Sequence, residues 1–224
     1  SSDVCSSDLK VKVLEYLDEL DPLCEKMGAS NTVVKTPEGK LVGYNTDGIG
    51  FIRSMERDGN VKIDENTYFC IGSGGAGRAM CSALAYYGAK KIYITDVFEE
   101  SSKSLVEDIN KNFAPVAEFC PAGDFSKVKE ATVVLNASGI GMGSHIGENP
   151  LPKEFISKDQ FYFDACYNPA KTQFLLDAEE AGATILNGLG MSLYQGAAQI
   201  EYWTGQEPPI EAMRQKLLDI ISEK

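Results

Sequence analysis

The sequence predicts an α/β protein with a doubly wound parallel sheet, and three observations support this prediction. From Tyr68 onward, short apolar segments alternate with longer segments that have the apolar spacing of helices. Such an alternation forms parallel βαβ units, in which helices cover both faces of the sheet. A glycine-rich turn joins the first of these strands to the helix after it, and a separate region of helices and a hairpin comes before them.

The apolar segments from Tyr68 onward supply the expected strands of the sheet. These strands are residues 68–72, 91–96, 131–138, 161–167 and 183–188. The helices expected between them are residues 78–88, 101–113 and 172–182. After the last strand, residues 191–224 predict two helices separated at residues 205–209, because glycine and proline interrupt the helical spacing there.

The region before the sheet begins with helical spacing. From Lys10 the apolar residues recur at positions that share one helix face as far as Leu20, which predicts a helix. Asp21 and Pro22 then open a second short helix that ends at Met27.

A hairpin and a further helix complete this first region. Residues 32–34 and 41–44 predict two strands, joined by a proline and glycine turn at residues 37–39. Residues 48–58 have helical spacing and lead into the sheet region.

Residues 1–9 (SSDVCSSDL) differ from the rest of the chain. They repeat the tripeptide SSD and have no apolar periodicity. The string SDVCSSDL is also what one reading frame of a common sequencing-adapter end encodes. We therefore expect residues 1–9 to be a non-native leader, with the native sequence beginning at about Lys10; a disordered native tail is the alternative.

The composition argues against several classes of partner. The net charge of −12 and the pI near 4.6 argue against nucleic acid and against an anionic membrane surface, since both require clustered lysine and arginine. No apolar run is long enough to span a membrane, and the sequence has no basic-then-apolar leader.

The cysteines and the single histidine predict no metal site. The six cysteines lie far apart without a C-x-x-C pair, which favours neither a zinc cluster nor a disulfide framework and fits the reducing cytoplasm. His145 lies in a glycine-rich loop, and we do not expect it to act in catalysis. We expect a cytoplasmic protein.

The segment CIGSGGAGRAM carries the most informative local motif. Gly72, Gly74 and Gly77 are in G-x-G-x-x-G register between an expected strand and an expected helix. In that context the glycines allow a tight turn and the close approach of a pyrophosphate, and the helix N-terminus supplies amide groups. This predicts a Rossmann dinucleotide site that includes Gly75 and Ala76; the alternative is a glycine-rich turn without a ligand.

Asp96 ends the next expected strand, 19 residues after Gly77. At that point a dinucleotide-binding fold places the side chain that contacts the adenosine ribose. A carboxylate accepts hydrogen bonds from the ribose hydroxyls and repels a 2′-phosphate, so NAD is favoured over NADP as the cofactor. The nearest cation, Lys103, lies inside the following helix. An Asp96 that faces solvent and contacts no cofactor is the alternative.

Three polar residues lie beside small residues that leave room for a ligand. They are Asn31 in GASNT, Asp47 in YNTDG and Gln195 in YQGAA. Each of them alone could be a turn or cap residue, since asparagine and aspartate favour such places. Together with the motifs around them, they match one family.

In order along the chain, the motifs that carry this match are GASNTVV, GYNTDGIGF, IGSGGAGRA, DACYNPAKTQFL, NGLGM and YQGAAQIEYWTG. The chain resembles shikimate dehydrogenases and their quinate/shikimate dehydrogenase relatives over nearly everything after residue 9. The first part of the family chain has no counterpart here, including the serines that bind the substrate carboxylate. The strand and the Pro-Tyr or Pro-His step before the family's catalytic lysine are also absent.

The resemblance divides the chain into parts. It implies that residues 10–50 are the remnant of an α/β substrate-binding domain and that residues 51–190 are the dinucleotide-binding Rossmann domain. Residues 191–224 are then C-terminal helices that pack back on the substrate domain.

By resemblance, Lys10 and Asp47 are the catalytic pair that flanks the reacting hydroxyl group. An ammonium near that oxygen can stabilise negative charge or donate a proton, while the carboxylate orients the ammonium. Which of the two is the acid/base stays open, because a close pair titrates as a unit. Asn31, Asp47, Tyr167 and Gln195 are implied to bind the substrate, and a packed aromatic residue is the alternative for Tyr167.

Two further positions are implied to lie along the cofactor. Gly188 corresponds to a residue near the nicotinamide in the family. Residues 136–142 follow a strand, and Ser138 in this loop could approach the dinucleotide. The family usually has Thr-Pro where this chain has Ser138 and Gly139, and a plain connecting loop is the alternative.

The sequence and the resemblance together predict an NAD(P)-dependent oxidoreductase that interconverts 3-dehydroshikimate and shikimate in chorismate and aromatic amino-acid biosynthesis. A quinate/shikimate dehydrogenase that prefers NAD is the first alternative, since many shikimate-specific members carry an Asn-Arg-Thr-like NADP signature where this chain has Asp96. A non-catalytic dinucleotide-binding module is the second. Folate and glutamyl-tRNA reductases lack the NTD and QGA motifs, and the sequence leaves a homodimer open.

Overall fold

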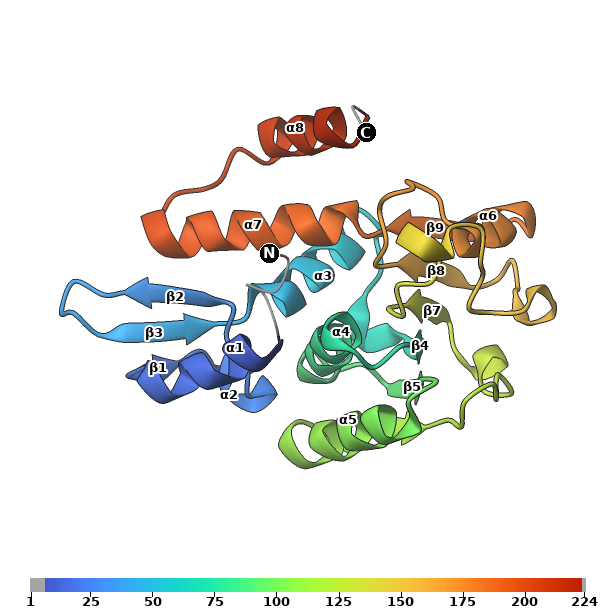
Figure 1. Ribbon diagram of the computed structural model, residues 1–224, viewed down its shortest axis with the longest axis horizontal. Helices are drawn as coiled ribbons and strands as arrows, with labels where there is room; N and C mark the ends of the chain where they lie inside the picture. The colour runs from blue at the N-terminus through green and yellow to red at the C-terminus, as the bar shows by residue number, and fades with distance from the viewer. Residues whose placement is uncertain (1–6, 223–224) are drawn as a thin grey trace.

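The computed structural model describes residues 7–222 and contains two sheets. The strands of the larger sheet are β4 (Thr67–Ile71), β5 (Lys91–Thr95), β6 (Ala117–Phe119), β7 (Val133–Asn136), β8 (Phe161–Asp164) and β9 (Thr184–Asn187). They are all parallel and lie in the order β6-β5-β4-β7-β8-β9. Helices α4 (Gly75–Tyr86) and α5 (Glu99–Asn112) lie on one side of this sheet and α6 (Gln173–Glu180) on the other (Figure 1). The predicted doubly wound α/β class is confirmed.

The smaller sheet lies beside the larger one. Its strands are β1 (Glu19–Leu20), β2 (Thr32–Lys35) and β3 (Leu41–Tyr44), in the order β1-β3-β2. The helices of this region are α1 (Ser7–Lys12), α2 (Pro22–Met27) and α3 (Thr46–Arg57). Helix α3 leads from the small sheet toward the large one, and it lies between the two sheets with α4 (Figure 1).

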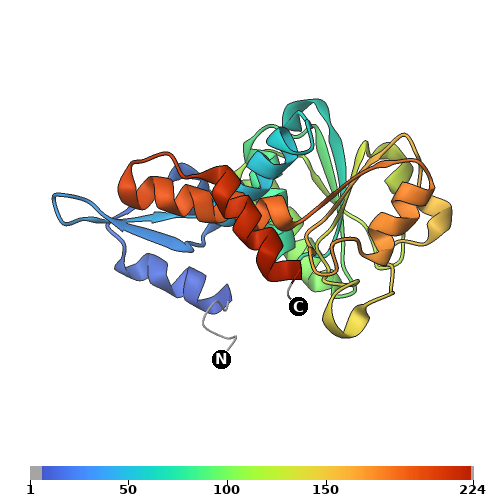
Figure 2. The same ribbon diagram turned by 90° about the horizontal axis from the view of Figure 1, so that it is seen from above.

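Two C-terminal helices pack over this arrangement. Helix α7 (Leu189–Thr204) runs along α3 and the hairpin (Figure 1), and Arg53 of α3 donates two hydrogen bonds to Glu201 of α7, at 2.9 and 2.8 Å. The rings of Tyr44 and Tyr202 stack at 4.0 Å between the hairpin and α7. Helix α8 (Ile210–Ser222) crosses α7 (Figure 2).

Most of the expected strands and helices lie where the sequence pattern places them. The hairpin, α2, α3, the glycine turn and both C-terminal helices are confirmed within a few residues of their predicted limits. Strand β6 was not predicted, because its three residues (AEF) are interrupted by a glutamate and form no apolar run. It pairs with β5 and extends the large sheet by one edge strand.

The predicted helix from Lys10 to Leu20 is wrong in its second half. The chain leaves α1 through a short 3-10 turn (Val13–Tyr16) and enters β1, which pairs in parallel with β3. The amide of Asp18 donates to the Leu41 carbonyl at 2.8 Å. A Cβ at Gly43 would lie 2.5 Å from Leu17 and 3.0 Å from Leu20, so these two side chains cover the glycine of β3. Tertiary pairing with an open strand edge outweighs the helical spacing here.

The core lies on both faces of the large sheet. Along β4, Tyr68 and Cys70 belong to one cluster of buried residues, whereas Phe69 and Ile71 belong to another. Strands that are buried on both faces are typical of parallel sheets covered by helices. The strands are therefore held firmly from two sides, and their ends offer a rigid edge on which to build a site.

Of the expected leader, residues 1–6 lie outside the described residues, and residues 7–9 form the start of α1. In the described part of the chain, no helix combines the length and the apolar composition that crossing a membrane requires.

Candidate functional site

The glycine turn follows β4 and needs glycine at two of its positions. Gly72 has a φ of +105°, and a Cβ there would lie 2.6 Å from the backbone of Ala137 and of Ser138. A Cβ at Gly77 would lie 2.0 Å from the carbonyl oxygen of Gly72. Gly72 therefore lets the turn lie against the loop after β7, and Gly77 lets α4 pack against the turn.

The outer side of the same turn is open. No atom lies within 4 Å of the Cβ that could be added at Gly74 or at Gly75. Gly74 is the N-cap of α4 and has no side chain to cap the amides of the first turn, to which Ala76 also belongs. Unpaired amides at a helix N-terminus bind anions, and no side chain covers the amides of this turn.

A cavity of about 450 Å³ lies beside this turn. Its wall includes Gly72, Gly74, Asp96, Phe98, Ser138 and His145. It lies at the carboxyl ends of β4, β5 and β7, where the strand order turns from one side of β4 to the other. Open α/β sheets bind ligands at this kind of switch point.

Asp96 follows β5 and ties it to the glycine turn. The amide and the hydroxyl of Ser73 donate to Asp96 Oδ2, at 2.6 and 2.8 Å, and the amide of Phe98 donates to Oδ1 at 2.9 Å. Oδ1 keeps a lone pair for a further donor, such as a ribose hydroxyl. Asp96 is half-buried and lines the cavity.

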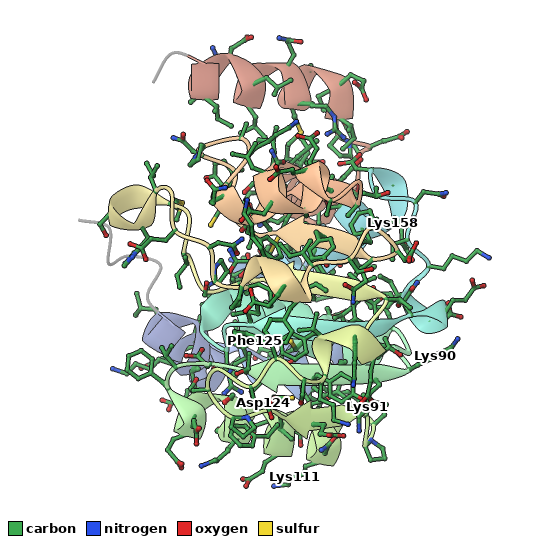
Figure 3. All side chains as sticks on the ribbon, turned by 90° about the vertical axis from the view of Figure 1, so that its right-hand side faces the viewer. Lys90, Lys91, Lys111, Asp124, Phe125 and Lys158 are labelled. Carbon is green, nitrogen blue, oxygen red and sulfur yellow. The ribbon has the colours of Figure 1, made fainter. Side chains whose placement is uncertain are left out.

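The cavity wall contains no lysine or arginine among the residues that the structure describes. Lys103 pairs with Glu100 at 2.9 Å, on the helix that follows β5. Arg78 of α4 pairs with Asp108 at 2.6 Å. Lys90 and Lys91 lie at the start of β5 and Lys158 precedes β8, and all three lie apart from Phe125, which lines the cavity (Figure 3).

His145 is a wall residue that the sequence did not suggest. Its Nδ1 lies 3.1 Å from both carboxylate oxygens of Glu148 in the same loop. The usable signal was its position: it belongs to the loop after β7, and loops at the carboxyl ends of parallel strands gather around one site. Val97 and Phe98, which are 78% and 75% exposed, also lie at this cavity and were not predicted to do so.

A second polar group forms around the first turn of α3. Lys10 Nζ donates to Asp47 Oδ2 at 2.7 Å, with 30% and 23% of the two side chains exposed. The amide of Ser30 donates to the carbonyl of Lys10 at 2.8 Å, which fixes α1 beside the hairpin. The structure thus joins two residues 37 positions apart in the chain into one ion pair.

Asn31 lies next to this pair. Its Oδ1 accepts hydrogen bonds from the amide of Thr46 at 2.9 Å, from the Thr46 hydroxyl at 3.1 Å and from the Thr32 hydroxyl at 2.9 Å. Since Thr46 precedes Asp47, Asn31 is held against the start of α3. The Asn31 Nδ2 group donates to no described residue, so it is available to a ligand.

Gln195 belongs to α7 and meets α3 at Gly50. A Cβ at Gly50 would lie 2.5 Å from the Met191 carbonyl oxygen and 2.7 Å from Gln195 Cβ. Gly50 lies one helical turn after Asp47, so Gln195 lies on the same side of the molecule as the ion pair. Within residues 7–222, the side-chain amide of Gln195 makes no hydrogen bond.

Tyr167 is not brought into this group by any contact. It follows β8, its side chain is 36% exposed, and its hydroxyl bonds to none of the described residues. Gly188 opens α7 from the neighbouring strand end, and a Cβ there would lie 2.0 Å from the Ala165 carbonyl oxygen. Burial raises the pKa of the Cys166 thiol to about 12, so this cysteine is not a ready nucleophile.

The two groups are linked through helix packing. A Cβ at Gly48, the residue after Asp47, would lie 3.1 Å from Ala83 Cβ and 3.5 Å from the Ala79 carbonyl oxygen. Both alanines belong to α4, the helix that begins at the glycine turn. The ion pair and the dinucleotide-type turn are therefore carried by two helices in direct contact. In the described residues no three histidine, cysteine or acidic side chains are grouped as ligands of a metal ion.

Known proteins are similar to this chain in sequence. A family model described as the Shikimate 5'-dehydrogenase C-terminal domain matches residues 188–218. The shikimate dehydrogenase (NADP(+)) of Bacillus cereus strain B4264 is 38% identical over 214 residues, which cover 94% of this chain and 75% of that protein.

Solved structures agree with these matches. The shikimate 5-dehydrogenase of Listeria monocytogenes, in complex with shikimate and NAD, has a TM-score of 0.87 and 36% identity over 93% of this chain and 74% of its own. The quinate dehydrogenase of Corynebacterium glutamicum, in complex with NAD, has a TM-score of 0.86 and 31% identity over 94% of this chain and 74% of its own.

Proposed function

The chain belongs to the shikimate dehydrogenase family, and on this premise we propose that it interconverts 3-dehydroshikimate and shikimate with NAD(P) as redox partner. The observation that carries the proposal is the 2.7 Å ion pair between Lys10 and Asp47. It stands at the start of α3, whose next residue packs on the helix of the glycine turn. A pair that can move a proton and a turn that can hold a dinucleotide thus lie on contacting helices.

The residues proposed to hold the dinucleotide surround the cavity and the end of the large sheet. They are Gly72, Gly74, Gly75, Ala76, Gly77, Asp96, Ser138 and Gly188. The open space at Gly74 and Gly75 supports this proposal, because a pyrophosphate needs backbone amides that no side chain covers. When bound, the nicotinamide ring supplies or accepts the hydride.

Lys10 and Asp47 are proposed to act on the oxygen of the reacting carbon. As the substrate carbonyl is reduced, its oxygen gains negative charge, and an ammonium beside it stabilises that charge and donates a proton. Asp47 holds the ammonium through the hydrogen bond to Nζ. In the reverse direction the same pair takes up the proton of the substrate hydroxyl.

Three further side chains are proposed to hold the ring substrate. The unpaired Nδ2 group of Asn31 and the unpaired amide of Gln195 are suited to the hydroxyl groups of a polyhydroxylated ring, since each offers donors that no described residue uses. Tyr167 is proposed as a hydroxyl donor from the end of β8. Asp47 completes this group as an acceptor.

Replacing the acid of the pair tests the catalytic proposal. We expect Asp47→Asn to lower the rate of NAD(P)-dependent shikimate oxidation by about 100-fold or more, because the ammonium loses its charged partner. The Kd for NADH, measured by fluorescence titration, should stay unchanged. Asp159→Asn, which changes an exposed acid that does not line the cavity, is the control. Turnover that survives Asp47→Asn would contradict the catalytic role of the pair. An unchanged protein that binds NADH but oxidises no shikimate would favour the alternative of a non-catalytic dinucleotide-binding module.

NAD is proposed as the preferred cofactor. The Asp96 carboxylate lines the cavity and repels a 2′-phosphate, and the described wall offers no lysine or arginine to hold one. Among the relatives, the Bacillus cereus enzyme is named for NADP(+), whereas the Listeria monocytogenes and Corynebacterium glutamicum structures contain NAD. The proposal of an NAD preference therefore rests on the local residues of this chain.

The preference is tested with two cofactors and two variants. We expect NADH to bind about tenfold or more tightly than NADPH, a difference of about 1.4 kcal/mol or more. Asp96→Ser should narrow that ratio by removing the like charge. Glu100→Gln is the control, because Glu100 is an acid of α5 outside the cavity wall. Equal binding of the two cofactors by the unchanged protein would contradict the proposal.

Quinate is a second candidate substrate. Asp96 favours it, since an NAD preference departs from the NADP signature of many shikimate-specific relatives, and one similar structure is a quinate dehydrogenase with NAD. Comparing kcat/KM for shikimate and quinate with the same cofactor distinguishes the two candidates.

A further inference from the structure

A buried carboxylate at the end of β8 stands behind the cavity wall. Asp164 is 0% exposed. Its Oδ1 accepts hydrogen bonds from Asn136 Nδ2 at 3.1 Å and from the Cys166 amide at 2.9 Å, and its Oδ2 accepts one from the Thr172 hydroxyl at 2.5 Å. Burying a carboxylate in a protein core costs free energy even when donors surround it. None of the proposed catalytic roles uses Asp164.

The donors around Asp164 match a charged carboxylate. The Thr172 hydroxyl accepts a bond from the Leu175 amide at 3.4 Å, which leaves its hydrogen for Asp164. Thr172 is also the N-cap of α6, where the helix dipole favours a negative charge. Burial raises the pKa of Asp164, while these hydrogen bonds act in the opposite direction and favour the ionised form.

Asp164 determines which way the Asn136 amide points. Asn136 Nδ2 donates to Asp164 and also to the Ile140 carbonyl at 3.0 Å, so its Oδ1 must face the other side. There Oδ1 accepts from the Ser138 amide at 3.1 Å and from the Ser138 hydroxyl at 2.6 Å. A flipped amide would place its NH₂ group against two donors and its oxygen against a carboxylate, which costs two hydrogen bonds on each side.

The loop fixed in this way is a wall of the cavity. Ala137, Ser138 and Ile140 all line it. The backbone of Ala137 and Ser138 also approaches Gly72 so closely that a Cβ there would lie 2.6 Å away. Displacing this loop therefore changes both the wall and the glycine turn opposite it.

We propose that Asp164 is a positioning residue for the dinucleotide. It touches no ligand and acts through Asn136, whose oriented amide holds residues 137–140 against the glycine turn. The inference rests on the proposed function, because it takes the cavity to be the dinucleotide site. It predicts a binding defect from a residue that is itself fully buried.

The test compares two buried residues of the same strand. Asp164→Asn replaces an acceptor by an NH₂ group that must face one of the three donors. Tyr162→Phe removes a buried hydroxyl that donates to Gln160 at 2.7 Å and accepts from the Ser157 amide at 2.8 Å, and none of these three residues lines the cavity. We expect both variants to unfold at lower urea concentration, but only Asp164→Asn to raise the Kd for NADH, by about tenfold. Tenfold corresponds to the loss of about one to two hydrogen bonds in the loop.

Two milder variants and one conservative control keep the test decisive if Asp164→Asn fails to fold. Ser138→Ala removes only the hydroxyl bond to Asn136, and Thr172→Val removes the donor to Asp164 Oδ2, while Thr172→Ser keeps it. We expect Ser138→Ala and Thr172→Val to weaken NADH binding severalfold and Thr172→Ser to bind as the unchanged protein does.

The outcomes separate this inference from the proposed function. If the unchanged protein binds NADH and Asp164→Asn, Ser138→Ala and Thr172→Val bind it equally well, the positioning role is overturned and the proposed function stands. If Tyr162→Phe weakens binding as much as Asp164→Asn at equal loss of stability, the role is again overturned, since general destabilisation then explains the effect. If the unchanged protein binds no NADH or NADPH, both proposals fail.

Discussion

The large and the small sheet differ in how much of the molecule supports them. Alternate residues of β4 enter two separate clusters of buried side chains, one on each face of the large sheet. The small sheet has no cluster of this size in the described residues, and the buried group beside it consists of Leu23, Ile49 and Ala198. One of these three comes from α7, far along the chain. The large sheet thus has its own core, whereas the small sheet depends on helices that pack across it.

The functional residues of the two regions depend on different parts of the chain as a result. The cavity is built from the ends of neighbouring parallel strands, so strand order alone brings its residues together. The Lys10–Asp47 pair joins residues 37 positions apart, and Gln195 lies beside α3 only because α7 packs on that helix. The cavity on the large sheet therefore tolerates substitutions elsewhere in the chain. The position of the Lys10–Asp47 pair and Gln195 depends on how distant helices pack.

The largest effect should come from a substitution in the glycine turn of the large sheet. Gly77→Ala places a Cβ 2.0 Å from the carbonyl oxygen of Gly72 and 2.8 Å from its carbonyl carbon, and both are backbone atoms that cannot rotate away. We expect a loss of about 3 kcal/mol in the free energy of unfolding, measured in urea, and no detectable NADH binding.

Gly74→Ala, in the same turn, is expected to affect ligand binding without affecting the stability of the fold. Nothing lies within 4 Å of a Cβ at Gly74, so the stability should change by less than about 0.5 kcal/mol. The added methyl group occupies the proposed phosphate space, and NADH binding should weaken. If Gly77→Ala is as stable as the unchanged protein, the packing of α4 against the turn is looser than its geometry requires.

A somewhat smaller effect is expected beside the small sheet, at the contact between α3 and α7. Gly50→Ala places a Cβ 2.5 Å from the Met191 carbonyl oxygen, which forces the two helices apart. We expect a loss of about 2 kcal/mol in stability and a fall in turnover with shikimate, because Gln195 moves away from Asp47. The Kd for NADH should remain within about twofold, since the cavity has no wall residue from α7.

A second glycine on α7 provides the control. At Gly196 the nearest atom to an added Cβ is Met213 Cε at 3.7 Å, an ordinary contact. Gly196→Ala should leave turnover unchanged and raise stability by up to about 1 kcal/mol, because alanine is the better helix former. Equal loss of NADH and substrate binding in Gly50→Ala would show that the two regions do not behave separately.

The sequence predicted the fold of the large sheet well because its signals are local. Each strand is a short apolar run, each helix has its own spacing, and the glycine turn is one continuous motif. Strand β6 escaped because an edge strand of three residues needs no apolar run. The helix predicted through Leu20 failed for the opposite reason: its spacing was helical, but Leu17 and Leu20 instead cover Gly43 of the neighbouring hairpin.

The candidate site could be predicted only where one motif carries several residues. The glycine turn and Asp96 follow from the spacing of a βαβ unit. His145 did not, because a lone histidine in a glycine-rich loop has no spacing to a partner that would mark it as a wall residue. Asp164 and Asn136 each look like ordinary strand-end residues, and only the parallel register that places them side by side reveals the hydrogen bond between them.

The smallest effect concerns a buried carboxylate beside the large sheet and the way its contribution to stability depends on pH. Asp177 of α6 is 3% exposed and accepts hydrogen bonds from Asn149 and Gln173, each at 2.6 Å, and an ion pair from Lys153 at 2.9 Å. Burial alone raises the pKa of Asp177, but the bonds from Lys153, Asn149 and Gln173 outweigh it and hold the pKa below its usual value. The folded state therefore favours the charged carboxylate.

Because the pKa is lowered on folding, the stabilisation is present above about pH 4 and disappears as the pH falls through the folded-state value. We expect Asp177→Asn to lower the free energy of unfolding at pH 7 by about 1 kcal/mol, and the gap between the two proteins to shrink at pH 3. Urea unfolding at both pH values measures it. If the difference in free energy of unfolding is as large at pH 3 as at pH 7, Asp177 acts through packing and not through its charge. The contacts of Asp177 with the loop from Asn149 to Lys153 would then stabilise the fold by packing alone.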